Sequence, residues 1–471
     1  MRSPPRAALL LFCSSFAAFF WAVKRRQFAL AMTGGFDSAQ YDQALWFTLR
    51  GAFMRTSLHG DPISILALHA TFFHALLAPL YALFPRPETL SQAQTLLFAA
   101  SAVPLCLAAE KRLGRRPGLL LTAACLLHPA VTDCLLNGYY GTRIFPVPFL
   151  IAALWALDEG RDGWFTLAAL AAAACDEATA LVVAGIGVFA ALALGRRRLG
   201  WSLAGAAGIY FIAAVAVIQP YFGNFNVLGP LELPIKSPTT LGSAAVYAAS
   251  HPLRLCLNAL QARKAWYAFK LFAPLLFLPL RAAAWLLPAA PVAVLTLFLT
   301  PRWLLADFTP AWTALCLPFL FFAAIEGAAR LAARPRASAG LCAAAAAASL
   351  AAHALGERST LTCVLFPEPG ALRNAEDLRA VLALIPKDAA VAATDTALPY
   401  LEGRERLYAL LPAGLARGPS FVLLEDGAVP GQTPGPDPAA AHARLTASVR
   451  ADSRYRLRAA RGAFTLLQAA R

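Results

Sequence analysis

Long apolar runs separated by short polar connections make up most of the first 356 residues. Eleven of these runs approach the length of about 20 residues that a helix needs to cross a bilayer. They are residues 7–23, 89–109, 118–135, 144–157, 163–176, 178–194, 200–218, 266–281, 283–299, 308–326 and 338–355. The pattern predicts an all-α polytopic membrane bundle over residues 1–356, with about 11 transmembrane helices and additional interfacial helices.

The composition also indicates a multi-pass membrane protein. Of the 471 residues, 59% are hydrophobic and 14% are charged, whereas soluble domains contain about 45–50% apolar and about 25% charged residues. The net charge of +15 comes from short basic clusters between the apolar runs, such as Arg196-Arg197-Arg198. Such clusters are typical of cytoplasmic loops, so we expect membrane lipids and no nucleic acid as partners. The nine cysteines contain no CxxC pair and predict no zinc site.

The first apolar run, 7–23, predicts an uncleaved membrane span, because Lys24-Arg25-Arg26 follow it without a signal-cleavage site. If the N-terminus is cytoplasmic, eleven spans put the later basic loops in the cytoplasm, as the positive-inside rule requires. The first loop, 24–88, and everything after residue 356 then lie outside. The triplet Lys24-Arg25-Arg26 is an exception to the rule.

The segment 63–84 is apolar and long enough to be a further span. Counting it as one would move the basic clusters at Lys111 and Arg196 to the outside. We therefore predict a re-entrant or interfacial helix on the outer side, which carries His69 and His74.

The chain becomes less apolar beyond residue 356 and predicts a small α/β domain over 357–471. Turn residues separate the expected elements. These elements are helices at 374–385 and 438–450 and strands at 389–394, 405–411, 421–426 and around 455–468. The absence of P-loop and GxGxxG patterns gives no reason to expect a nucleotide.

Two carboxylates lie among apolar residues in the first loop, in the stretch GFDSAQYDQALWF at 35–47. We predict a helix over 36–50 that lies along the outer membrane surface. Asp37 is either a functional acid or the helix cap, with Gln40 as its capping-box partner. Asp42 falls in mid-helix, where an acid needs a partner, so we predict a functional role for it.

Further charged residues fall at the predicted outer ends of apolar runs. Asp176 and Glu177 lie between two spans, where acids need a cavity or a cationic partner such as Arg143, or else they cap a tight turn. Arg143 could hold a lipid phosphate or simply mark a loop. His69 is either a ligand or an ordinary polar residue of the interfacial helix.

Three stretches carry a resemblance to a known family: FD-x4-DQALW at 36–46, LLAPLYALFP at 76–85 and AATDTALPYLEGRERLY at 392–408. They resemble a bacterial family of multi-pass membrane proteins of unknown function, which is distantly similar to the GT-C glycosyltransferases. That class includes protein mannosyltransferases and lipid A aminoarabinose transferases. The chain departs from the family pattern at Arg143, at Cys175-Asp176-Glu177 and at Asp307, where the family tends to carry other residues.

The resemblance implies a membrane glycosyltransferase of the bacterial inner membrane, with an external active site and a polyprenyl-phosphate-linked sugar donor. Asp37 and Asp42 match the acids of the family motif and are the predicted catalytic residues. In this hypothesis Arg143 binds phosphate and Asp176 and Glu177 support the site, while a divalent metal is left open. The alternatives are a transporter or lipid flippase that uses Asp42, Asp176 and Glu177, or a catalytically silent scaffold.

Overall fold

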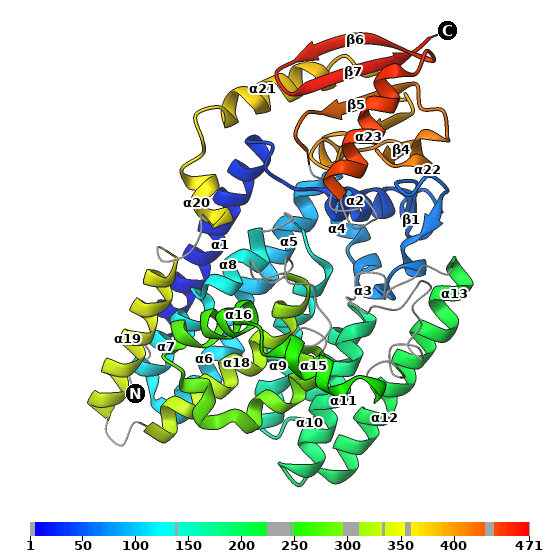
Figure 1. Ribbon diagram of the computed structural model, residues 1–471. Coiled ribbons are helices and arrows are strands. Elements are labelled where there is room, and N and C mark those ends of the chain that lie inside the picture. Colours follow the sequence, from blue (N-terminus) through cyan, green and yellow to red (C-terminus); the bar gives the residue numbers. More distant parts are fainter. Residues whose placement is uncertain are drawn as a thin grey trace.

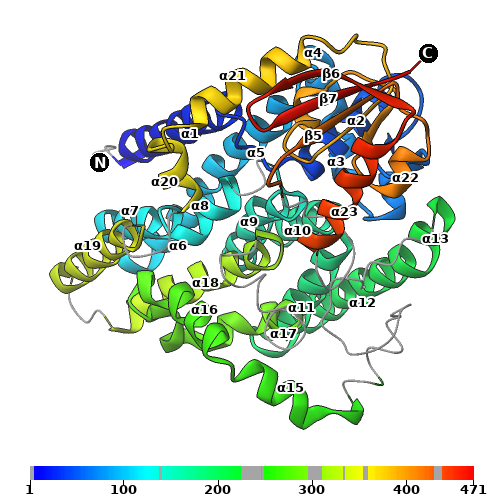
Figure 2. The same cartoon turned by 45° about the horizontal axis from the view of Figure 1, so that its top comes forward.

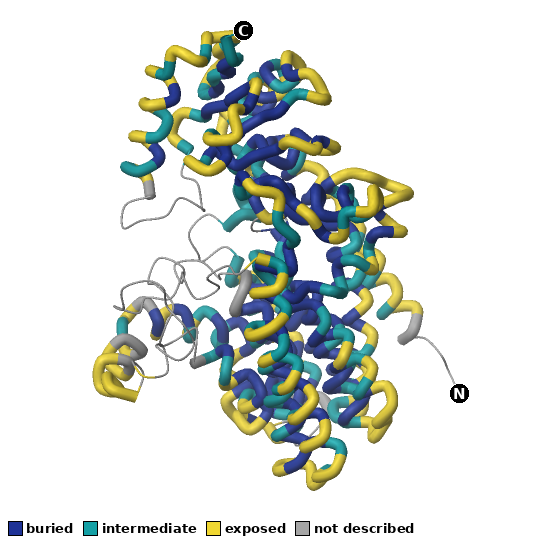
Figure 3. The backbone as a smooth tube through the Cα atoms, turned by 90° about the vertical axis from the view of Figure 1, so that its right-hand side faces the viewer, coloured by how far each residue is buried: buried dark blue, intermediate teal, exposed yellow. Residues whose placement is uncertain are grey.

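The computed structural model describes residues 5–136, 140–223, 246, 249–294, 310–331, 335–353, 359–428 and 438–470. A bundle of helices forms its larger part, and a small domain with a sheet covers one end of the bundle (Figure 1). The predicted fold class, a helical membrane bundle followed by a small α/β domain, is confirmed. Buried residues run through both parts, while exposed residues lie at the loops of the far end of the bundle and over the outside of the C-terminal domain (Figure 3).

The described parts of the predicted apolar runs fall largely on the helices of the bundle. These helices are α1 (Pro5–Ala29), α5 (Pro87–Ala100), α6 (Ala102–Leu113), α7 (Arg115–Leu126), α8 (Pro129–Leu136), α9 (Pro146–Asp158), α10 (Asp162–Ala173), α11 (Glu177–Leu192), α12 (Arg197–Ala213), α13 (Gln219–Phe222), α15 (Pro252–Ala259), α16 (Ala262–Phe272), α17 (Ala290–Val294), α18 (Pro310–Leu331) and α19 (Pro335–Ala352). A π-helical turn, Ala214–Ile218, joins α12 to α13, and 3-10 segments η4 (Ala273–Leu275) and η5 (Leu278–Ala289) follow α16.

Fewer helices than predicted have the length and composition of a span. Among the described residues, four do so on their own: Ala7–Ala29, Pro87–Leu113, Arg197–Phe222 and Thr313–Leu331. Two bent pairs raise the number to six, one with a 47° bend between α7 and α8 and one with a 115° bend between Lys264–Leu275 and Leu278–Ala293. The runs 266–281 and 283–299 therefore correspond to the two arms of one bent pair, in so far as they are described.

The basic connections gather at the end of the bundle remote from the sheet domain (Figure 1). Arg112 links three of them, because it contacts Asp158 at 2.6 Å and Glu326 at 3.0 Å. Arg196, in the connection between α11 and α12, pairs with Asp162 at the start of α10 and so joins a fourth connection to the one between α9 and α10. This grouping agrees with the cytoplasmic loops expected from the sequence.

The basic triplet at the end of α1 is used in packing. Lys24 is fully buried, and its Nζ donates to the carbonyl of Ser91 at 3.0 Å and to Oε1 of Gln94 at 3.3 Å. Arg26 donates through Nε to the carbonyl of Val364 at 2.8 Å. At least two of the three charges that break the positive-inside pattern therefore join α1 to neighbouring segments.

The first loop begins with α2 (Phe36–Thr48) and a hairpin of β1 (Arg55–Thr56) and β2 (Ile63–Ser64). The single helix predicted over 63–84 is wrong: β2 is followed by η1 (Ile65–Ala67), α3 (Phe72–Ala75) and α4 (Ala78–Leu83). The break comes from contacts with a distant part of the chain, since the backbone N–H of Ala70 donates to Glu177 and that of Phe73 donates to the carbonyl of Ala174. These donors bind the α10–α11 turn instead of closing helical turns.

The C-terminal domain contains a five-stranded sheet of order β4-β3-β5-β7-β6, with β3 parallel to both of its neighbours and the other pairs antiparallel. Its strands are β3 (Val391–Ala393), β4 (Leu407–Ala409), β5 (Phe421–Glu425), β6 (Tyr455–Arg461) and β7 (Phe464–Ala469). Its helices are α20 (Thr360–Leu365), α21 (Ala371–Leu382), η8 (Leu398–Tyr400), α22 (Pro412–Leu415) and α23 (Pro438–Ala451). Every strand overlaps its predicted range, and α21 begins three residues earlier than expected.

Helix α2 lies between this domain and the bundle (Figure 2). Phe36 and Ala39 share a buried cluster with Leu398 and Leu401 of the domain. Gln43, further along α2, also contacts the domain, since its Nε2 donates to the carbonyl of Arg404 at 3.0 Å. The two stretches that carry the family resemblance, around 36–46 and 392–408, therefore contact each other.

Gln43 also holds the loop that follows α2. Its Oε1 accepts from the backbone N–H of Ser57 at 2.8 Å and from Oγ1 of Thr56 at 2.9 Å. Ser57 in turn donates through Oγ to the carbonyl of Leu407 in β4 at 2.8 Å, and the N–H of Ala409 donates to the carbonyl of Leu58 at 3.0 Å. The first loop and the edge of the sheet are thus joined by a continuous hydrogen-bond network.

Candidate functional site

Asp37 stands in the first turn of α2, and its side chain is exposed. The helix begins after Gly35, and no side chain caps it. The capping interpretation of Asp37 is therefore wrong. The surrounding protein displaces water and raises the pKa of the Asp37 carboxyl, while the nearby positive charges of His69 and Arg143 lower it.

A charged network, formed by His69, Arg143, Asp176 and Glu177, lies close to Asp37, and its two acids are buried. The imidazole Nδ1 of His69 is 2.9 Å from Oε1 of Glu177 and 3.7 Å from Oδ2 of Asp176. The guanidinium Nε of Arg143 is 3.3 Å from the same Oδ2. The sequence predicted Arg143 as the partner that the acid pair requires, and the structure forms this contact.

The turn between α10 and α11 fixes both carboxylates. Asp176 is the N-cap of α11, and its Oδ1 accepts from the backbone N–H of Ala178 at 2.8 Å. Oε2 of Glu177 accepts from the N–H of Ala70 at 2.9 Å. The capping interpretation of Asp176 is confirmed. The cap coexists with the contact to Arg143, because one carboxylate oxygen can accept two hydrogen bonds: Oδ1 accepts from the N–H of Ala178 and, at 3.4 Å, from Nε of Arg143.

The charges of the network compensate one another. Burial alone would lower the pKa of His69, but the carboxylates of Glu177 and Asp176 outweigh it and raise that pKa. Burial raises the pKa of Asp176, and the Arg143 guanidinium opposes this effect. Two anionic carboxylates thus face one permanent cation and one imidazole that readily becomes a cation.

Asp42, the second predicted acid, has a different setting. It is 2% exposed, and its Oδ1 accepts a hydrogen bond of 2.6 Å from the hydroxyl of Tyr81. Burial raises the pKa of Asp42 to about 8, against the opposing effect of the bond from Tyr81. Within the described part of the chain, no contact links Asp42 to the charged network.

Sequence reasoning missed a buried polar cluster beside the network, formed by Tyr41, Thr71, His74 and Tyr140. The ring of Tyr41 lies 5.0 Å from that of His74 and 5.4 Å from that of Tyr140. The side-chain polar atoms of all four residues are buried without a hydrogen-bond partner among the described residues. No periodic pattern could have found this cluster, since it assembles from α2, α3 and the segment before α9.

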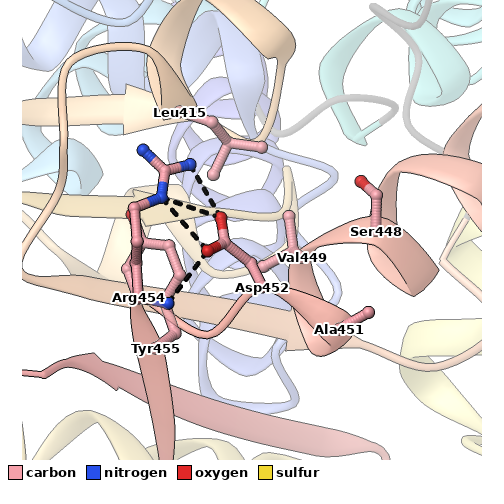
Figure 4. A pocket seen from close by; sticks show the side chains of 7 residues that line it. All are labelled: Leu415, Ser448, Val449, Ala451, Asp452, Arg454 and Tyr455. Atoms are coloured by element: carbon pink, nitrogen blue, oxygen red, sulfur yellow. Dashed lines mark hydrogen bonds and ion pairs between the residues drawn. The ribbon is translucent and has the colours of Figure 1, made fainter.

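A surface cavity of about 430 Å³ on the C-terminal domain is lined by none of the predicted site residues (Figure 4). Asp452 and Arg454 line it, and they pair with each other at 2.7 Å. An acid that is already paired with a neighbouring base offers little to a substrate. We therefore place the candidate site at Asp37 and the charged network.

Comparisons with known proteins agree with this architecture. Residues 28–456 match the family described as "Predicted membrane protein (DUF2079)". No curated protein matches the sequence. The crystal structure of ArnT from Cupriavidus metallidurans bound to undecaprenyl phosphate is similar, with a TM-score of 0.57 over 97% of each chain and 12% sequence identity. ArnT is a GT-C glycosyltransferase, so the predicted GT-C-like fold is confirmed.

Proposed function

The chain belongs to the DUF2079 family of predicted membrane proteins, and we propose that it is a GT-C-type glycosyltransferase that uses a polyprenyl-phosphate-linked sugar. The likeness to ArnT, whose crystal structure holds undecaprenyl phosphate, supports a polyprenyl-phosphate lipid as part of the donor. Proteins that share a fold can catalyse different reactions, so the proposed reaction is argued from the residues of the candidate site.

The observation that carries it is the position of Asp37. An exposed carboxylate stands beside a partly buried cation, Arg143, which is held in place by Asp176. These residues come from α2, from the segment before α9 and from the α10–α11 turn, and they meet at the end of the bundle that carries the C-terminal domain. Acids at one end of the bundle fit a transferase better than a transport path through its middle.

Asp37 supplies the base for the reaction. The acceptor hydroxyl transfers its proton to the Asp37 carboxylate while its oxygen forms a bond to C1 of the sugar. The bond between C1 and the phosphate oxygen breaks, and its electron pair leaves with the polyprenyl phosphate. The raised pKa of Asp37 makes this carboxylate a stronger base than an ordinary aspartate.

Arg143 stabilises the leaving group. The phosphate gains one negative charge as it departs, and a guanidinium can donate two parallel hydrogen bonds to it. Asp176 orients the guanidinium through the contact at 3.3 Å, and Glu177 orients His69 through the bond at 2.9 Å. Asp176 and Glu177 are positioning residues in this scheme. Asp42 stays a predicted catalytic acid whose role requires a separate test.

The orientation follows from charge. The end with Lys111, Arg112 and Arg196 faces the cytoplasm by the positive-inside rule. In this proposal Asp37 and the C-terminal domain lie on the external side of the bacterial inner membrane, and the donor lipid is used on that side. On a cysteine-free background, an external cysteine-labelling reagent should react with a single cysteine introduced at the exposed Ser453 only if this orientation holds.

The function is tested in cells whose chromosomal gene is deleted. The donor lipid should accumulate in the deletion strain and be detected by mass spectrometry of polyprenyl-phosphate lipids. The wild-type gene and an Asp61→Asn control should remove it, because Asp61 is an exposed acid of the same loop that pairs with Arg417. Asp37→Asn should not remove it. Unchanged lipid profiles in the deletion strain would contradict the proposal.

A binding measurement tests recognition of the lipid phosphate independently of the transfer reaction. Undecaprenyl phosphate should raise the thermal stability of the purified protein, as any ligand of the folded state does. Arg143→Gln should abolish this increase, and Arg196→Gln, at the opposite end, should retain it. Equal stabilisation of both variants would place the lipid phosphate elsewhere.

A further inference from the structure

The geometry of the charged network points to a divalent cation site formed by His69, Asp176 and Glu177. One donor atom from each residue faces a common point: Nδ1, one carboxylate oxygen and another carboxylate oxygen lie within 4.8 Å of one another. Ligand atoms at about 2.0–2.2 Å from a metal are at most about 4.4 Å apart, so shifts of less than an ångström would close the site. We propose that this site binds a divalent cation such as Mn²⁺.

The carboxylates are arranged as metal ligands usually are. In each of them one oxygen is anchored by a backbone N–H, from Ala178 to Asp176 at 2.8 Å and from Ala70 to Glu177 at 2.9 Å. The other oxygen of each carboxylate turns towards Nδ1 of His69. Outer hydrogen bonds of this kind fix the orientation of ligating groups before the metal arrives.

Asp176 gives a second and independent reason to expect a cation at this site. Its side chain is 0% exposed, and its Oδ2 has no hydrogen-bond partner among the described residues. The ion contact with Arg143 at 3.3 Å leaves a second lone pair on this oxygen. Binding of a cation stabilises a buried carboxylate oxygen that lacks a hydrogen bond more than it stabilises an exposed carboxylate oxygen.

The cation replaces a proton. Without a metal, the short distance between His69 and Glu177 requires a proton on Nδ1. With a metal, Nδ1 offers its lone pair and the ring keeps its proton on Nε2. One imidazole and two carboxylates form a ligand set that suits Mn²⁺, Fe²⁺ or Zn²⁺ more than Ca²⁺.

The role of the cation rests on the proposed function, although its binding does not. Asp176 and Glu177 together carry two negative charges, and Arg143 offsets one of them. A divalent cation leaves the site with a net charge of +1, which a phosphodiester monoanion of the donor would neutralise. The cation and Arg143 would then share the charge that develops on the leaving phosphate.

The test uses the purified full-length protein, stripped of metal with a chelator and titrated with Mn²⁺. Free Mn²⁺ is measured by electron paramagnetic resonance. We expect one bound Mn²⁺ per chain, with affinity reduced at least about ten-fold in Glu177→Gln and in His69→Gln. Glu177→Gln keeps an oxygen for the N–H of Ala70, and His69 is partly exposed, so both variants should fold. The matched control is Glu159→Gln, which removes an acid that pairs with Lys111 at 2.9 Å at the other end of the bundle.

The outcomes separate the two proposals. Wild-type protein without stoichiometric Mn²⁺ binding, or variants that bind as wild type does, would overturn the site. A folded Glu177→Gln protein is recognised by a cooperative unfolding transition and by the circular dichroism spectrum of wild type. The melting temperatures of wild type and of Glu159→Gln should rise with Mn²⁺, and that of Glu177→Gln should not. Binding of Mn²⁺ together with an unchanged lipid profile in the gene deletion would support the site and contradict the proposed function.

Discussion

The two acids of α2 lie five positions apart and have opposite environments. Asp37 is exposed, and its pKa responds to the charges of His69 and Arg143. Asp42 is sealed from solvent and bound to the hydroxyl of Tyr81. A short sequence motif therefore places one carboxylate where a substrate can meet it and the other where it joins two elements of the protein.

The difference arises from what packs on each side of the helix. The C-terminal domain covers the face with Phe36 and Ala39, and α4 supplies Tyr81 to the face with Asp42. Asp37 projects from the remaining face, close to the α10–α11 turn. Neighbours distant in the sequence thus decide which acid is available for chemistry.

The largest expected effect is on transfer. Asp37→Asn should reduce the transfer rate about 10²- to 10⁴-fold, because it removes the general base. The melting temperature should stay at the wild-type value, since Asp37 is exposed and caps no helix. Asp42→Asn should keep more activity than Asp37→Asn. The reverse order of the two variants would show that the acids have exchanged roles.

Next in size is the loss of Arg143. Arg143→Gln leaves the buried carboxylate of Asp176 without its guanidinium and should cost about 3–5 kcal/mol of stability. Adding Asp176→Asn should recover part of this loss, because the unpaired charge disappears. Unfolding in denaturant measures both effects. Arg196→Gln breaks a partly exposed pair with Asp162 and should cost no more than about 1 kcal/mol; equal losses at the two sites would refute the buried pairing.

Removal of Gln43 should loosen the C-terminal domain. Gln43→Ala deletes hydrogen bonds to Ser57 and to the carbonyl of Arg404, and we expect a cost of about 1–3 kcal/mol. Hydrogen exchange should accelerate at the backbone N–H of Ala409, which bonds to the first loop. Gln40→Ala, which loses the contact with His59 at 2.7 Å and none of the bonds to the C-terminal domain described above, is the matched control. An unchanged hydrogen-exchange rate at Ala409 in Gln43→Ala would show that Gln43 does not hold the C-terminal domain to the first loop.

A smaller effect depends on pH through Asp42. Its folded-state pKa of about 8 lies above the unfolded value of about 4. The stability that protonated Asp42 contributes is therefore fully present below about pH 4 and is lost as the pH rises through about 8. Asp42→Asn, which keeps an acceptor for Tyr81, should flatten this decline by at least about 1 kcal/mol between pH 5 and pH 8. Parallel profiles for wild type and variant would contradict a buried neutral Asp42.

Much of the fold could be predicted because its signals are local. Apolar runs located the bundle helices, and alternating or β-branched stretches between turn residues located all the strands of the C-terminal domain. The segment 63–84 could not be predicted, because contacts of Ala70 and Phe73 with the α10–α11 turn replace a regular helix. Those contacts join residues about a hundred positions apart.

The residues proposed for the site could be singled out in the sequence, but their assembly could not be predicted. Charge in apolar surroundings identified Asp37, Arg143 and the pair Asp176-Glu177. Sequence spacing could not show that His69 meets Glu177, or that Asp37 is exposed while Asp42 is buried. Tyr41 and its buried polar neighbours carry no charge pattern at all, so only the structure reveals them.

A cryo-electron microscopy structure of the full-length protein with undecaprenyl phosphate would show directly where the lipid phosphate binds. We expect the phosphate within hydrogen-bonding distance of the Arg143 guanidinium, on the side where Asp37 is exposed, with the Asp42–Tyr81 bond intact. A phosphate bound at Asp42, or at the basic end of the bundle near Arg112, would contradict this expectation.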